Sequence, residues 1–164
     1  MSKQKYFIQK YNNINHVFEL KSLPNCEVSH NYKNDTVVAV LPIRFDNGKA
    51  RYTLQINIDK NGLYSVYIIK PKLKKIGGDN PPHIYLYKSI WNQANQEFDE
   101  CCLCLHLPNS GEYKKKSTLI DTIISWAIKW TEFYEIWLMT GEWYGGGIHA
   151  NNDLEKEKSS KKES

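Results

Sequence analysis

"TVVAVLPIRFDNGKARYTLQINIDKNGLYSVYIIKP", residues 36–71, is the stretch that decides the fold. It holds three β-branched, apolar segments, at 36–45, 50–59 and 63–71, separated by two Asn-Gly pairs. In the middle segment apolar and polar side chains alternate, which is typical of a strand with one buried face. Because Asn-Gly is a strong signal for a tight hairpin turn, the stretch predicts a three- or four-stranded antiparallel meander that pairs in chain order.

The period of the apolar residues changes after Ser117. From there they recur at spacings of three and four, which predicts one long amphipathic helix over 118–140 that is capped by Ser117 or Thr118 and ends near Gly141. The residues on this apolar face are Ile120, Ile123, Ile124, Ala127, Trp130, Tyr134, Trp137 and Leu138. Because such a helix must bury this face against the meander, the predicted fold class is α+β, with the helix packed on an antiparallel sheet.

The chain of 164 residues predicts one domain over 1–149, followed by a charged and disordered tail at 150–164. A short helix over 4–12 and a short extended segment over 83–88 are also expected. We find no signal peptide and no apolar run long enough to span a membrane, so we expect a cytoplasmic protein. The net charge of +4 is spread over separate lysine clusters, and no nucleic-acid-binding motif accompanies it. We therefore expect neither a membrane nor a nucleic acid as partner.

Three of the four cysteines lie within four positions, in "DECCLCLHLPNSGEY" at residues 99–113. Free cysteine packs as a small hydrophobic residue, and we favour this interpretation for Cys101 and Cys102. A disulfide between these neighbours would be strained, and a reducing compartment opposes it. A catalytic nucleophile is a further interpretation, for which Cys104 is the candidate.

A metal site is another interpretation of the same stretch. On an extended segment Cys102, Cys104 and His106 share one side, and His83 or His149 could be a fourth ligand. Zinc sites usually contain two Cys-x₂₋₄-Cys pairs or their histidine equivalents, and a second pair is missing here. The sequence therefore argues against a bound metal, and we expect no cofactor.

Four stretches together carry a resemblance to a known family: "YTLQINIDKNGLYSVYIIKPKL" (52–73), "PPHIY" (81–85), "LCL" (103–105) and "LIDTIISWAIKWTEFYEIWLMTGEWYGGGIH" (119–149). Their order resembles the ubiquitin-conjugating (UBC-like) fold, in which a meander leads to a His-Pro-Asn-aliphatic-Tyr stretch, then to the catalytic cysteine and leucine, then to helices. The chain is more closely similar to the bacterial UBC-like proteins of short type II CBASS antiphage operons, which are encoded beside a cGAS-like nucleotidyltransferase. The resemblance covers about residues 36–149.

The resemblance implies that Cys104 is the nucleophile, because the matching pattern L-C-L-x-x-P includes Leu103 and Pro108. Cys102, which is also followed by leucine, is the alternative nucleophile. His83 falls on the asparagine of the family's motif, where it would donate to the oxyanion or lower the pKa of the thiol.

Three further positions are compared with the family's pattern. Residues 89–100 look like an insertion between the two motif elements, and we expect an ordered or mobile surface excursion near the site. Tyr113 stands where the relatives usually have tryptophan. His149 matches the family's terminus, and its role is left open.

The resemblance also implies a function. The cysteine would carry the C-terminus of the cognate cGAS-like nucleotidyltransferase as a thioester, and the conjugation would prime second-messenger synthesis. The sequence contains no P-loop and no Gly-x-Gly-x-x-Gly motif after a strand, so an activating enzyme must act in trans, or the reaction runs without one. The alternative function is a non-catalytic UBC-like binding module that regulates a partner protein.

Overall fold

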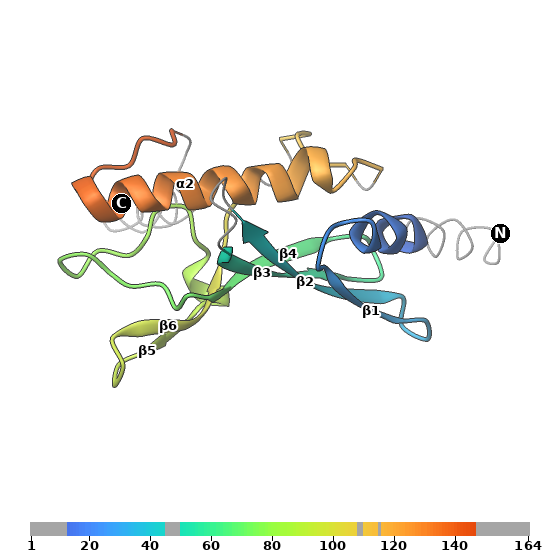
Figure 1. Cartoon of the computed structure of the whole chain (residues 1–164), viewed down its shortest axis with the longest axis horizontal. Coiled ribbons are helices and arrows are strands. Elements are labelled where there is room, and N and C mark those ends of the chain that lie inside the picture. The colour runs from blue at the N-terminus through green and yellow to red at the C-terminus, as the bar shows by residue number, and fades with distance from the viewer. Residues whose placement is uncertain (1–12, 45–49, 108–109, 115, 147–164) are drawn as a thin grey trace, which may run out of the picture.

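The computed structural model describes residues 13–44, 50–107, 110–114 and 116–146. Its meander has four antiparallel strands that pair in chain order (Figure 1): β1 (Glu27–Asn31), β2 (Thr36–Arg44), β3 (Ala50–Ile58) and β4 (Tyr64–Lys70). The three predicted strands are thereby confirmed, with ends that differ by a residue or less from those expected. Strand β1 was not predicted, because it contains one apolar residue, Val28, and none of its residues is buried.

The sheet continues past the meander with a hairpin, in the order β1-β2-β3-β4-β6-β5. Strand β5 (Ile90–Asn92) lies at the edge, and β6 (Glu97–Cys102) reaches β4 with its last two residues, Cys101 and Cys102. Residues 89–100, which were expected to form an ordered or mobile surface excursion, make most of an ordered hairpin at the edge of the sheet, and Phe98 is the one buried residue among them. Phe98 is buried and its ring lies 4.9 Å from that of Trp91, an apolar contact that holds the hairpin together.

The predicted long helix is present, with an unexpected first turn. A π-helical turn, η2 (Ile120–Ile124), leads directly into α2 (Ser125–Thr140). The predicted cap is wrong, because Leu119 occupies that position and the Thr118 hydroxyl instead donates to Asp121 at 2.6 Å. The predicted end at Gly141 is confirmed, where a left-handed φ of 74° lets its N–H donate to the Trp137 carbonyl at 2.8 Å.

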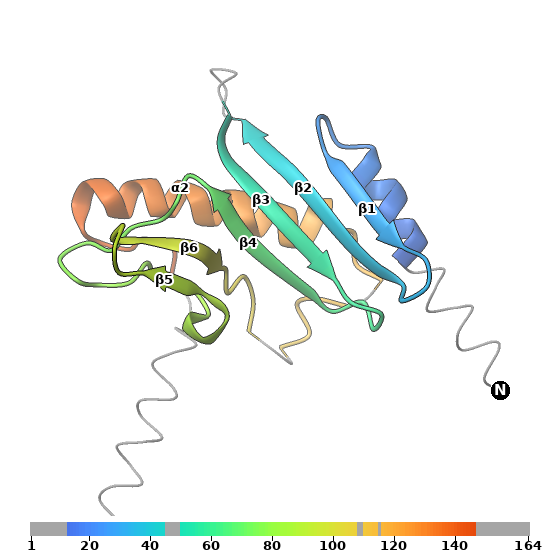
Figure 2. The same ribbon diagram turned by 90° about the horizontal axis from the view of Figure 1, so that it is seen from below.

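One face of the sheet carries the core (Figure 1). Helix α2 lies across it, and six of the eight predicted helix residues are buried, whereas Ile120 and Leu138 are 39% and 43% exposed. A helical segment over 13–21, which was not predicted, adds Val17 and Leu20 to the same core. Figure 2 looks onto the opposite face, which neither helix covers. The alternation predicted for 50–59 is confirmed, because the residues that face the core are all buried: Tyr52, Leu54, Ile56 and Ile58.

The second Asn-Gly pair forms the predicted turn. Gly62 has a φ of 74°, and its N–H donates to the Asp59 carbonyl at 2.9 Å. The first pair, Asn47-Gly48, lies outside the described residues, as do the helix expected at 4–12 and the tail at 150–164. Within the part of the chain that the structure describes, no helix is both long and apolar enough to cross a bilayer.

Candidate functional site

The fold brings the two motif elements together, although residues 86–102 separate them in the chain. Ile84 and Leu103 form an antiparallel β-bridge. On one side of the bridge the Cys104 N–H donates to the His83 carbonyl at 2.9 Å, and on the other the Tyr85 N–H donates to the Cys102 carbonyl at 2.8 Å. The extended segment predicted over 83–88 is confirmed at the Ile84 bridge. It is wrong for the last three residues, because η1 (Leu86–Lys88) is a 3₁₀ turn.

His83 has a backbone conformation that few residue types accept. Its φ is 55°, in the left-handed region where Asn, Asp and His are enriched among non-glycine residues. Helix α2 fixes the residue before it, since the Trp130 indole Nε1 donates to the Pro82 carbonyl at 3.1 Å. The strained conformation is thus held by a contact from the core helix.

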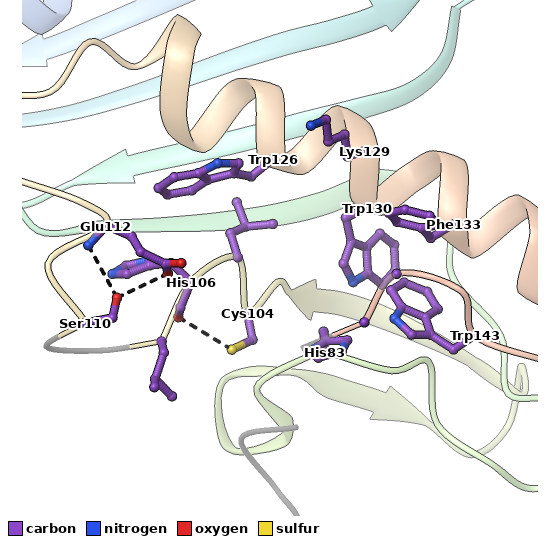
Figure 3. A pocket seen from close by; sticks show the side chains of 14 residues that line it. His83, Cys104, His106, Ser110, Glu112, Trp126, Lys129, Trp130, Phe133 and Trp143 are labelled. Carbon is purple, nitrogen blue, oxygen red and sulfur yellow. Dashed lines mark hydrogen bonds between the residues drawn. The ribbon is translucent and has the colours of Figure 1, made fainter. Parts of the chain in front are cut away.

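A cavity of about 430 Å³ opens between the cysteine stretch and helix α2 (Figure 3). The sheet side contributes Cys104 and two predicted candidates, His83 and His106. The helix side is aromatic and includes Trp126, Trp130, Phe133 and Trp143. The volume falls within the range of pockets that bind small ligands.

The four cysteines differ in their surroundings. Cys101 and Cys102 are each 1% exposed, so the packing predicted for them is confirmed, and Cys101 belongs to the core cluster with Leu103. Cys104 is 8% exposed, and it is the one cysteine that lines the cavity. All four thiols are free, and none is joined in a disulfide.

Burial keeps the thiols protonated at neutral pH. It raises the pKa of Cys101 to about 12 and that of Cys102 to about 11. Burial also raises the pKa of Cys104, but a hydrogen bond from the Tyr85 hydroxyl acts in the opposite direction. The cavity therefore holds a protonated thiol with a neighbouring donor that favours its thiolate.

His106 is the second imidazole of the cavity. Its Nδ1 is hydrogen-bonded to the Tyr64 hydroxyl, and its ring lies 5.8 Å from that of Trp126. Burial lowers the pKa of His106 below 6.5, and the Glu112 carboxylate offsets part of this effect. The imidazole is therefore neutral at pH 7 and able to accept a proton.

Tyr113 packs against this histidine. Its ring lies 4.7 Å from that of Tyr64 and 5.8 Å from that of His106. Its hydroxyl donates to the Gly62 carbonyl at 3.3 Å, which ties the loop after the cysteines to the turn between β3 and β4. The tyrosine therefore adds an aromatic contact beside His106.

A metal site needs several ligand side chains close together. Among the described residues, no three His, Cys, Asp or Glu side chains are grouped so that they could hold a metal ion. His149, which was considered as a fourth ligand, lies outside those residues.

Comparison with known proteins gives one match, to a protein family. A family model described as "Type II CBASS E2 protein" matches residues 16–150, which is most of the chain. The chain belongs to this family. Membership implies a role in CBASS antiphage defence and agrees with the resemblance seen in the sequence. No curated protein matches this chain.

The sequence reasoning missed the wall of the cavity that α2 provides. Trp126, Lys129, Trp130 and Phe133 lie at helical spacing and all line it, but Trp130 alone was on the predicted apolar face. Their spacing of three and four could have indicated a second, partly exposed aromatic stripe. Trp143 was part of the quoted terminus, although no role was assigned to it.

Proposed function

We propose that this chain is a conjugating enzyme with a UBC-like fold, in which Cys104 carries the C-terminus of a cognate cGAS-like nucleotidyltransferase as a thioester. The observation that supports this most is the position of Cys104, the one cysteine on the wall of the cavity. Membership in the CBASS E2 family and the order of the motif elements support the same chemistry. Cys102, the alternative nucleophile, is buried and does not line the cavity.

The proposed reaction needs an activated cargo. The donor is an acyl adenylate or an acyl thioester of the cargo's C-terminal carboxyl group, made by an activating enzyme in trans. The Cys104 sulfur attacks the carbonyl carbon as its thiol proton passes to a base, and a tetrahedral oxyanion forms. This attack forms the new C–S bond, and collapse of the oxyanion restores the carbonyl and breaks the bond to AMP or to the donor sulfur, which leaves as AMP or as the donor thiolate. An amine of the acceptor then attacks the thioester, forms an amide and releases the Cys104 thiolate.

We propose that the His83 side chain donates a hydrogen bond to the oxyanion and stabilises it. Its backbone carbonyl accepts the Cys104 N–H, and its side chain lines the same cavity, where the family's motif has asparagine. A preorganised donor at such a position stabilises the charge that develops in the transition state. The variant His83→Asn keeps both a donor and a residue type that accepts the left-handed backbone, whereas His83→Ala keeps neither. Conjugation should therefore survive in His83→Asn and fall in His83→Ala, and retention in both would remove this role.

The proposal is tested by co-expressing the chain with the nucleotidyltransferase and other proteins encoded beside it, followed by intact-mass analysis with and without added thiol. The wild type should show an adduct that thiol removes. Cys104→Ala should lose this adduct, and Cys101→Ala should retain it as a matched control. If Cys102→Ala loses the adduct while Cys104→Ala retains it, Cys102 is the nucleophile and the assignment of Cys104 is wrong.

A non-catalytic binding module is the second candidate function. The 8% exposure of Cys104 and the upward shift of its pKa favour it, because a nucleophilic cysteine must be reached and must ionise. This function expects a reversible complex with the partner that thiol does not affect. It also expects that the complex persists in all three cysteine variants.

A further inference from the structure

The indole of Trp143 has a hydrogen-bond donor without an acceptor. Its Nε1 is buried, and among the residues that the structure describes it has no hydrogen-bond partner. Other tryptophans differ, because the Trp130 Nε1 donates to the Pro82 carbonyl and the Trp91 Nε1 donates to the Gln93 side chain. An indole N–H can only donate, and buried ones are usually satisfied. An unsatisfied donor at this position therefore calls for an explanation.

The side chain that carries this donor lines the cavity that contains Cys104. After Gly141 the chain turns back along α2, so that Trp143 packs with its ring 5.8 Å from that of Trp130 and 5.8 Å from that of Phe133. Its ring lies 5.6 Å from that of His83 (Figure 3). The unsatisfied N–H is thus placed beside the proposed reacting groups and is not in a remote part of the core.

Gly145 is the residue next to this N–H. A Cβ at position 145 would lie 2.7 Å from the Trp143 Nε1 and 2.9 Å from a ring carbon of Phe133, which is closer than real contacts allow. Gly145 and Gly146 both line the cavity, and neither has a side chain that would cap the donor. An entering peptide consequently meets glycine backbone at this point.

We propose that the Trp143 N–H binds a backbone carbonyl oxygen in the C-terminal peptide of the cargo. That the peptide is the C-terminus of the cargo rests on the proposed function. The unsatisfied donor and the two glycines beside it, Gly145 and Gly146, are features of the structure itself. An extended peptide end presents carbonyl acceptors, and the aromatic walls from Trp126 and Phe133 give its side chains an apolar surface. Binding would satisfy the one polar atom of Trp143 and hold the terminal carbonyl near Cys104.

The test measures binding without chemistry. The probe is a synthetic peptide of about ten residues that matches the C-terminus of the nucleotidyltransferase encoded beside this chain, labelled with fluorescein at its N-terminus. Fluorescence anisotropy gives its affinity for Cys104→Ala protein, which cannot form the thioester. Trp143→Phe in this background removes the N–H and keeps an aromatic ring, so the affinity should fall about two- to tenfold, as expected for one hydrogen bond.

Two further variants sharpen the test. Trp91→Phe, which lies outside the cavity, should leave the affinity unchanged. Gly145→Ala would bring a methyl group to 2.7 Å from the donor, so the indole must shift, and binding should also weaken; this variant provides a second result if Trp143→Phe does not fold. The free energy of unfolding in urea is measured for each variant and compared with its affinity for the peptide, so that a structural role of Trp143 can be told from a binding role. Trp143→Phe breaks no internal hydrogen bond, so a variant that loses stability and keeps full affinity would overturn the proposal.

The result does not depend on whether the thioester forms. If no adduct is found at Cys104 but the peptide binds through Trp143, this inference stands and the proposed chemistry fails. If the adduct forms while Trp143→Phe and Gly145→Ala bind the peptide as well as their parent, the inference is wrong and the proposed chemistry stands. Failure of the peptide to bind the parent protein would also overturn the inference.

Discussion

Replacing Tyr85 by phenylalanine is expected to slow the alkylation of Cys104. The Tyr85 hydroxyl donates a hydrogen bond to the thiol sulfur, and this bond lowers the pKa of Cys104 against the larger, opposite effect of burial. The thiolate is the form that reacts with alkylating agents. Without the hydroxyl the pKa of Cys104 rises further, so a smaller fraction of the thiol is ionised at any pH below that pKa.

The size of the effect follows from one hydrogen bond. The net contribution of such a bond is about 0.5–1.5 kcal/mol, which corresponds to about a two- to tenfold smaller thiolate population. A thiolate of higher pKa is a better nucleophile, and this offsets nearly half of the effect on a logarithmic scale. The rate constant at pH 8 should therefore fall about 1.5- to fourfold.

The assay follows iodoacetamide labelling by peptide mass spectrometry between pH 7 and pH 9. In the wild type the rate at Cys104 should rise through this whole range, because its pKa lies above 9.0. Cys102, with a pKa of about 11, should label more slowly in the same sample. Tyr87→Phe is the matched control, since Tyr87 is a neighbouring tyrosine that is 72% exposed. The reasoning is refuted if Tyr85→Phe reacts as fast as wild type, or if Cys104 labels at a rate independent of pH near 7.

Three other changes have defined outcomes. Ile84→Ala should lower the free energy of unfolding in urea by about 2–5 kcal/mol, because Ile84 is 1% exposed and forms the bridge to Leu103; a loss below about 1 kcal/mol would contradict this. Cys101→Ala should cost about 1 kcal/mol in the same measurement, with adduct formation retained. The folded pKa of His106 is below 6.5, so the unfolded chain binds its proton first and stability falls as pH drops through 6.5. His106→Gln should reduce this fall, and an unchanged fall would contradict the assigned shift.

The meander and the long helix could be predicted because their signals are local. The period of two in β3 and the Asn-Gly pair before Leu63 depend only on neighbouring residues. The β5–β6 hairpin was missed because its turn has no glycine. Instead the Asn92 side chain accepts the N–H groups of Ala94 and Asn95, and Gln96 takes a φ of 55°. An asparagine at the start of a short polar segment therefore indicates a turn even where glycine is absent.

The candidate site could be predicted in part. The motif elements gave Cys104 and His83, and the structure places both on one cavity. The rest of the wall depends on how distant segments pack, because Trp126 and Phe133 come from α2 and Trp143 from the segment after it. The unsatisfied indole N–H and the contact that requires glycine at position 145 are tertiary features, and neither is visible in the sequence.

The most direct test of the central claim is the chemical nature of the bond at residue 104. The wild type and Cys104→Ser are each incubated with the nucleotidyltransferase activated at its C-terminal carboxyl group as an acyl adenylate or thioester, and the adducts are mapped by peptide mass spectrometry. A thioester enzyme should give a wild-type adduct on Cys104 that excess thiol removes. The variant should carry an oxyester on position 104 that resists thiol and is released by mild base. An adduct that maps to another residue, or a wild-type adduct that resists thiol, would contradict the account.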